Sequence, residues 1–117
     1  MVSTIAWGGD YKVRRTVEGH TLDITLNRNP PIMGKNEIRI EIKDTHGKFV
    51  TNNLVTVNYY MPPMPGMPPM NYTLKAVPHG SGYVATMDFI MTGPWNVVVK
   101  ASTAGKQLRL TVPIDVR

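Results

Sequence analysis

Residues 37–43 read EIRIEIK, and this short stretch decides the fold class. Its three isoleucines alternate with charged side chains, so one face of the segment is apolar and the other is suited to water. A period of two is typical of a half-buried β-strand, because successive side chains of a strand point to opposite faces of the sheet. The stretch therefore predicts a strand with its isoleucines in a core.

The same alternation continues on both sides of this stretch. It predicts further strands at residues 11–17, 21–26, 54–60, 72–77, 82–91, 95–101 and 107–116, and no segment has a convincing helical pattern. Turn signals separate these runs about every ten residues, which is typical of an all-β, immunoglobulin-like sandwich of seven to eight antiparallel strands. We expect residues 1–10 to be an N-terminal extension and residues 11–117 to form one domain.

The amino-acid composition and charge exclude several kinds of functional site. The 117 residues include no cysteine, which excludes disulfides, thiolate zinc sites, iron–sulfur clusters and cysteine nucleophiles. The net charge is +5, but the basic residues are scattered and Arg14-Arg15 is their one adjacent pair, so we expect no nucleic-acid partner. No apolar run approaches the roughly 20 residues that span a bilayer. Residues 1–10 have no basic-then-apolar leader, so we expect the signal or anchor of an exported protein to lie outside this sequence.

Patterns of catalytic residues do not occur. Ser81 lies close to His79, but Tyr83 stands where the motif G-x-S-x-G requires its last glycine. Neither G-x-x-x-x-G-K-[ST] nor G-x-G-x-x-G occurs, and the few carboxylates form no pair suited to acid–base work. We therefore predict that the domain is not an enzyme.

One segment breaks the strand pattern: residues 61–70 read MPPMPGMPPM. Five prolines fix φ near −65° and remove amide donors, which excludes an inner strand and favours a polyproline II helix. With about three residues per turn, the methionines would share one face at spacings of about 9 Å. Gly66 is the one free joint, and a bend there would bring Met64 and Met67 together.

The segment supplies candidate metal ligands, because thioether sulfur is soft and selects Cu(I). The candidate ligands are Met61, Met64, Met67, Met70 and, from a nearby loop, His79. Two other interpretations stay open: the methionines pack as flexible apolar side chains, or they form a pliable protein-binding surface.

Other residues have structural interpretations. Met87 and Met91 share a strand face with Phe89, so we expect them to pack in the core. Trp95 is expected to be a core anchor whose indole N–H finds one partner, and Tyr83 to pack at the sandwich edge. His20 and His46 lie beside glycine in predicted turns, so we expect both to be exposed.

The second half of the chain resembles the YtkA-like family, which is similar to FixH-like proteins and to domains of heavy-metal efflux systems. The resemblance covers residues 37–116 and is carried, in order, by D-x-x-G-K-x-V (44–50), V-x-V (55–57), M-P-x-M (61–64), G-Y-x-A (82–85) and F-x-M-x-G-x-W-x-V-x-V (89–99). It implies an immunoglobulin-like sandwich, a periplasmic or other extracytoplasmic location after export or membrane anchoring, and handling of copper or another heavy metal. The family often has Met-Gly-Met where this chain has Met64-Pro-Gly-Met67.

Two functions are expected from these features. The first is a non-enzymatic envelope domain that binds Cu(I) or Ag(I) through the methionine–proline segment. The alternative is an interaction module of an envelope complex, such as an efflux adaptor or an oxidase assembly factor, with this segment as its docking surface.

Overall fold

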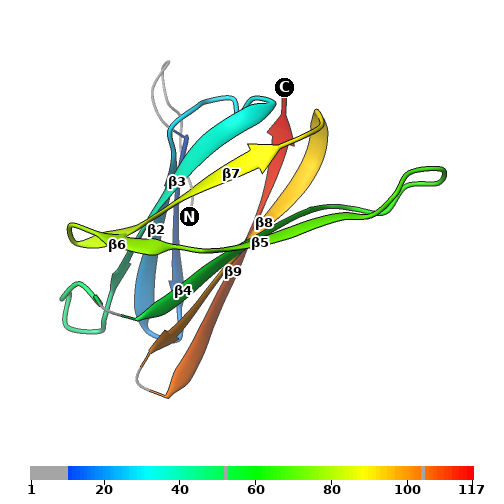
Figure 1. Cartoon of the computed structure of the whole chain (residues 1–117). Helices are drawn as coiled ribbons and strands as arrows, with labels where there is room; N and C mark the ends of the chain where they lie inside the picture. Colours follow the sequence, from blue (N-terminus) through cyan, green and yellow to red (C-terminus); the bar gives the residue numbers. More distant parts are fainter. Residues whose placement is uncertain (1–10, 52, 104) are drawn as a thin grey trace.

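The computed structural model describes residues 11–51, 53–103 and 105–117, which form two antiparallel β-sheets packed face to face (Figure 1). The described residues form strands and connecting turns without a helix, which confirms the all-β class. The strands are β1 (Tyr11–Val17), β2 (His20–Leu26), β3 (Gly34–Lys43), β4 (Leu54–Met61), β5 (Met70–Lys75), β6 (Val77–His79), β7 (Gly82–Phe89), β8 (Gly93–Thr103) and β9 (Lys106–Val116).

The strand order is that of an immunoglobulin-like sandwich. One sheet has the order β1-β2-β3-β7-β6 and the other β5-β4-β8-β9. Strands β2, β3, β7 and β6 occupy the places of strands A, B, E and D of an immunoglobulin domain, and β4, β8 and β9 those of C, F and G. The predicted fold class is confirmed. The described residues form more strands than the seven to eight predicted, because the segment predicted at residues 72–77 is divided between β5 and β6.

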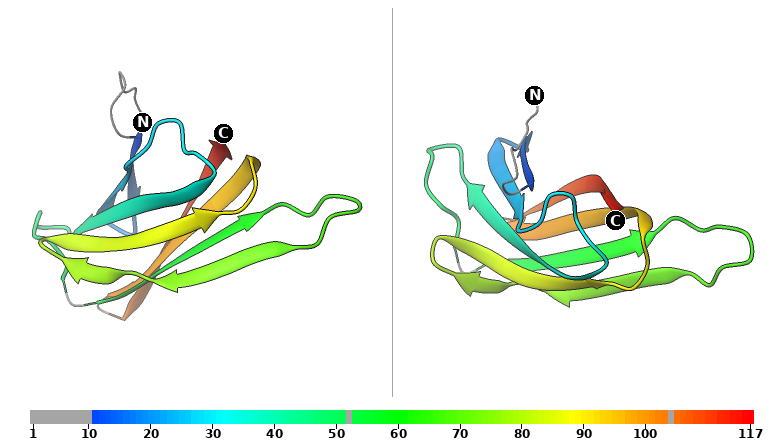
Figure 2. Two further views of the ribbon diagram at one scale, coloured as in Figure 1. Left: turned by 45° about the horizontal axis from the view of Figure 1, so that its top comes forward. Right: turned by 90° about the horizontal axis from the view of Figure 1, so that it is seen from above.

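This division takes place at Ala76, where the chain passes from one sheet to the other. β5 pairs with β4 in one sheet, whereas β6 pairs with β7 in the other. The Ala76 side chain is buried, and its amide donates a hydrogen bond to the Val55 carbonyl at 2.9 Å. The two strands follow one another as a long extended segment (Figure 2). The β4–β5 hairpin and the β6–β7 turn therefore lie at opposite ends of that segment.

The core is built from the inward positions of the alternating strands. Ile38, Ile40 and Ile42 of β3 are fully buried, as their spacing predicts. Trp95 is also buried, and its indole N–H donates to the Met91 carbonyl at 2.9 Å, which confirms the expected single partner.

Tyr83 is a core residue, and its predicted place at the sandwich edge is wrong. Its ring is fully buried, its hydroxyl donates to the Val50 carbonyl at 2.9 Å, and the same hydroxyl accepts from the Asn53 amide at 3.1 Å. The preceding Gly82 is needed for close approach of two strands, since a methyl group there would collide with the Ile40 carbonyl oxygen. The Tyr83 hydroxyl therefore fixes the connection between β3 and β4 to the sandwich, and Gly82 allows β7 to lie close to β3.

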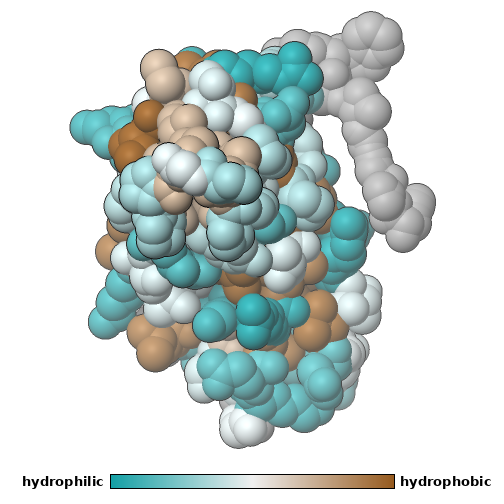
Figure 3. Space-filling model, turned by 90° about the vertical axis from the view of Figure 1, so that its right-hand side faces the viewer, coloured by the Kyte–Doolittle hydropathy of each residue, from teal (hydrophilic) through white to brown (hydrophobic). Residues whose placement is uncertain are grey.

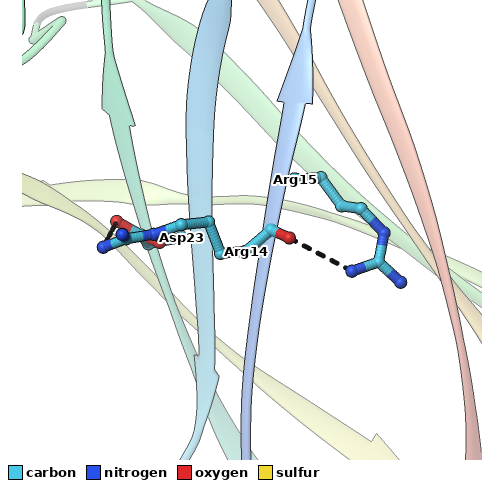
Figure 4. A network of polar contacts seen from close by, with 3 residues as sticks. All are labelled: Arg14, Arg15 and Asp23. Carbon is cyan, nitrogen blue, oxygen red and sulfur yellow. Dashed lines mark hydrogen bonds and ion pairs between the residues drawn. The ribbon is translucent and has the colours of Figure 1, made fainter. Parts of the chain in front are cut away.

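The only adjacent basic pair in the sequence lies on edge strand β1. Arg14 and Arg15 point to opposite sides of the strand (Figure 4). The Arg14 Nε lies 2.6 Å from Asp23 Oδ1 on β2, its cross-strand neighbour, whereas an Arg15 guanidinium nitrogen donates to the Arg14 carbonyl at 3.1 Å. The Arg14 side chain is thus engaged in strand pairing, and the two cations form no joint basic patch.

The turn at residues 44–47 is organised by the Asp44 carboxylate. Asp44 Oδ1 accepts hydrogen bonds from the backbone amides of His46 at 2.8 Å and Lys48 at 3.0 Å. These two hydrogen bonds lower the pKa of Asp44, because they favour its ionised form. Gly47, at φ 79°, completes the turn.

We expect this turn to contribute a pH-dependent part of the stability. Because the pKa of Asp44 is lower in the folded protein than its ordinary value of 3.8, the contribution is complete above that value and is lost as the pH falls through the folded-state pKa. Asp44→Asn keeps an acceptor oxygen but removes the charge, so the variant should lose less stability than the wild type on acidification.

The measurement is urea unfolding of both proteins at pH 7 and at pH 3. Asp88→Asn is the control, since the Asp88 carboxylate accepts no hydrogen bond within the described part of the chain. If the Asp44→Asn and wild-type proteins lose stability in parallel between the two pH values, this account of the turn is wrong.

Candidate functional site

The methionine–proline segment is the closed end of the β4–β5 hairpin. The strand ladder ends at the pair Met61↔Met70, and the loop beyond it projects away from the sandwich (Figures 1 and 2). At the tip, the Met67 amide donates to the Met64 carbonyl at 3.1 Å, and Gly66 has φ 79°. Proline followed by a positive-φ glycine at the centre of such a bond is a type II turn. The predicted straight helix with four methionines on one face is therefore wrong, and the predicted bend at Gly66 is confirmed.

This turn sorts the methionines into two pairs. The sequence MPPMPGMPPM reads alike from both ends around Pro65-Gly66, so Met64 faces Met67 and Met61 faces Met70 across the hairpin. The first and last Cα atoms of a β-turn are less than about 7 Å apart. Two flexible thioether side chains at such a separation are able to reach a common ion.

The two methionine pairs differ in how far they are buried, and so in whether they are able to bind an ion from solution. Met61 is only 5% exposed and belongs to the core, where its methyl group lies close to Gly93. Met70 is half-buried and packs against the same core. At the tip, Met64 is 36% exposed and Met67 is half-buried. We therefore place the accessible thioethers at Met64 and Met67 and assign the base pair to packing.

The root of the hairpin is anchored by aromatic rings. Tyr59 of β4 lies 5.3 Å from Tyr72 of β5, 5.4 Å from Phe89 and 5.9 Å from Trp95, measured between ring centroids. Such separations suit edge-to-face and tilted packing of aromatic pairs. The hairpin thus leaves the sandwich from a rigid base.

The surface of the projecting hairpin has few strongly hydrophilic atoms. Figure 3 faces this end and shows pale and tan atoms there, with teal atoms mainly below and around it. None of residues 54–74 is charged, and the first charge after them is Lys75. Neither a cation nor a carboxylate is contributed by the hairpin itself.

The structure does not bring His79 to the methionines. His79 lies nine positions after Met70 along the extended β5–β6 segment, a span of about 30 Å at roughly 3.3 Å per residue. Arg39 of β3 donates from its guanidinium to His79 Nδ1 at 3.2 Å, which places a fixed positive charge against that nitrogen. The predicted addition of His79 to the methionine ligands is corrected on these two grounds.

The other predicted side chains divide as follows. Met87 is fully buried and Met91 packs against the core, as predicted. His46 is exposed, as expected, but His20 is buried, with Nδ1 donating to the Glu18 carbonyl at 3.1 Å.

Two further features bear on the choice of site. Among residues 11–51, 53–103 and 105–117, no three His, Cys, Asp or Glu side chains are grouped so as to hold a metal ion. A shallow pocket of about 460 Å³, which no sequence pattern indicates, lies between Tyr11, residues 29–31 and the end of β9. Its charged lining residues, Asp115 and Arg117, pair with each other at 3.1 Å. The hairpin tip is therefore the stronger candidate.

Fold and site together define a small immunoglobulin-like β-sandwich domain with a rigid, projecting methionine hairpin. Residues 16–100 match the YtkA-like family, and the chain belongs to that family. The match runs from the end of β1 into β8 and includes the whole hairpin. Comparison with curated proteins and with solved structures gave no significant match. Family membership suggests an envelope-associated domain. Within the described residues, no helix is long and apolar enough to cross a membrane.

Proposed function

We propose that this chain is a non-enzymatic, extracytoplasmic domain that binds a soft metal ion, Cu(I) or Ag(I), through Met64 and Met67. The observation that carries the proposal is the turn at Pro65-Gly66, which brings the backbone of Met64 and Met67 together at the tip of the hairpin, with Met64 exposed and Met67 half-buried. Soft thioether sulfur selects Cu(I) over hard ions. Membership of the YtkA-like family supports the envelope setting.

The stiffness of the hairpin favours binding. Prolines 62, 63, 65, 68 and 69 restrict the backbone before any ion arrives, so little backbone entropy is lost on binding. The uncharged surroundings add selectivity for a soft ion. Hard cations prefer oxygen ligands, above all carboxylates, and residues 54–74 contain no carboxylate. Thioethers at the tip thus favour a soft monovalent ion.

The test is an anaerobic Cu(I) titration against a competing chelator, with Ag(I) as a redox-silent check. The double variant Met64→Leu/Met67→Leu keeps side-chain volume and removes both sulfurs. Since loss of a supporting outer-shell group alone costs a metal site about 10–100-fold, loss of both ligands should weaken binding by more than about 100-fold.

Met33→Leu provides the matched control, because Met33 is 55% exposed and lies outside the hairpin. It should bind as the wild type does. Affinity should also be equal at pH 5 and pH 8, since thioethers do not titrate there, whereas a histidine ligand would lose affinity at pH 5. Unchanged binding by the double variant, or an equal loss in Met33→Leu, contradicts the assignment.

The projection of the hairpin favours a second candidate function, an interaction module of an envelope complex such as an efflux adaptor or an oxidase assembly factor. Met64 and Tyr72 expose 36% and 37% of their surface on this projection, and a flexible methionine surface suits protein docking. Replacing residues 62–69 by the two-residue turn Asn-Gly would close the hairpin at Met61↔Met70 without its tip. A pull-down in which that variant still captures every natural neighbour would exclude the tip as a docking surface.

A further inference from the structure

The hairpin tip offers an ion fewer donors than a closed site needs. Met64 and Met67 are the first and last residues of the same turn, and Gly66 and the prolines between and around them have no donor side chain. Metal sites that keep an open coordination position accept a further ligand there, whereas sites closed by protein ligands do not. A pair of thioethers on one tip therefore leaves part of a bound ion open.

The rest of the same chain does not close this site within its described part. Met61 is buried in the core, and Met70 packs against it at the base of the hairpin. His79 lies at the far end of the β5–β6 segment, next to Arg39. The missing donors must come from solvent or from another molecule.

A second copy of the chain meets the requirement. A two-fold contact uses the same patch on both partners, so the tip of each copy would present its Met64 and Met67 to the same ion. Residues 54–74 carry no charge, so two tips approach one another without placing like charges in contact, although each chain has a net charge of +5. The hairpin projects from the sandwich (Figures 1 and 2), so the two bodies stay apart when the tips meet.

We propose that one Cu(I) or Ag(I) ion joins the tips of two copies of this chain, with Met64 and Met67 of each copy as its ligands. The proposal rests on the proposed metal-binding function and adds its partner and stoichiometry. Binding of the ion and pairing of the chains are then one event.

The experiment is sedimentation velocity of the full chain during titration with Ag(I). The mass should double from 13.0 kDa and stop changing at one ion per two chains. Met33→Leu should behave as the wild type, and Met64→Leu/Met67→Leu should remain a monomer at every Ag(I) concentration. A mixture of wild type with differently tagged double variant should contain no mixed dimer after Ag(I) is added, while circular dichroism checks that the variant is folded.

The outcomes separate the two proposals. Binding of one Ag(I) per chain with no change in mass overturns the pairing and leaves the proposed function standing. Absence of Ag(I) binding overturns both. Doubling that persists in the double variant overturns the assignment to the tip, since the chains would then meet through another surface.

Discussion

Replacement of Trp95 by alanine is expected to lower the free energy of unfolding by about 3–5 kcal/mol, the range for removal of a large buried aromatic side chain. Trp95 is 1% exposed, its ring lies 5.2 Å from Phe89 and 5.9 Å from Tyr59, and its N–H is bonded to the Met91 carbonyl. The variant therefore loses apolar contacts, leaves a cavity and leaves a carbonyl without its donor. Urea unfolding at 25 °C measures the change.

Two control variants divide this effect into parts. Trp95→Phe keeps one ring in the cluster but removes the N–H, so we expect a smaller loss of about 1–2 kcal/mol. Ile90→Ala alters a neighbouring apolar residue that is 53% exposed, and we expect a change within about 0.5 kcal/mol. If Trp95→Ala is no more destabilising than Ile90→Ala, the aromatic cluster does not anchor the hairpin root.

Asn36→Ala is expected to cost about 2–4 kcal/mol, because three hydrogen bonds of about 1 kcal/mol each are lost and the groups left behind are unpaired. Asn36 is fully buried in β3. Its Nδ2 donates to the carbonyls of Ile32 at 2.6 Å and Gly34 at 3.0 Å, and its Oδ1 accepts from the Ile32 amide at 3.1 Å. One side chain thus satisfies the backbone of the loop that enters β3.

Asn36→Asp provides a more specific test. It keeps an acceptor for the Ile32 amide but places a carboxyl oxygen against two carbonyls, so the variant should be less stable at pH 7, where the group is driven to ionise, than at pH 4. Asn71→Ala is the control, since Asn71 is exposed and accepts one hydrogen bond from Asn58. Equal stability of Asn36→Ala and Asn71→Ala would contradict the role of Asn36.

The strands were predictable because their signal is local. The alternation at residues 37–43 arises because one face of the strand lies in the core and the other faces water. The same alternation of apolar and polar residues is visible within the sequence of each strand. The alternation also covers His20, which we did not include in the predicted strand. His20 precedes Leu22 by two positions, so it shares the inward face of β2 and is buried. Its position beside a glycine turn was the weaker guide.

The separation of β5 from β6 was not predictable in the same way. Residues 72–77 look like one strand because each half is extended, and only pairing with different neighbours distinguishes them. That pairing depends on residues far away in the sequence, and it decides where His79 lies. The placement of His79 in the candidate site failed for this reason.

The structure of the hairpin tip was predictable only in part. Pro65-Gly66 is the favoured central pair of a type II turn, so the bend had a signal in the sequence. The burial that separates Met61 and Met70 from the tip had none, since it depends on Gly93 and on the core that the other strands form. The sequence thus indicates which residue types are present, and the fold decides which of them are accessible.

The prolines of the hairpin also bear on solubility. An uncharged, apolar-rich projection is a hazard for aggregation, because exposed strand edges pair with the edges of other chains through amide hydrogens. Proline has no amide hydrogen, and the two Pro-Pro pairs remove these donors from both arms beyond the Met61↔Met70 pair. The arms of the hairpin therefore offer fewer amide donors to the strand edge of another chain than an ordinary hairpin of the same length would.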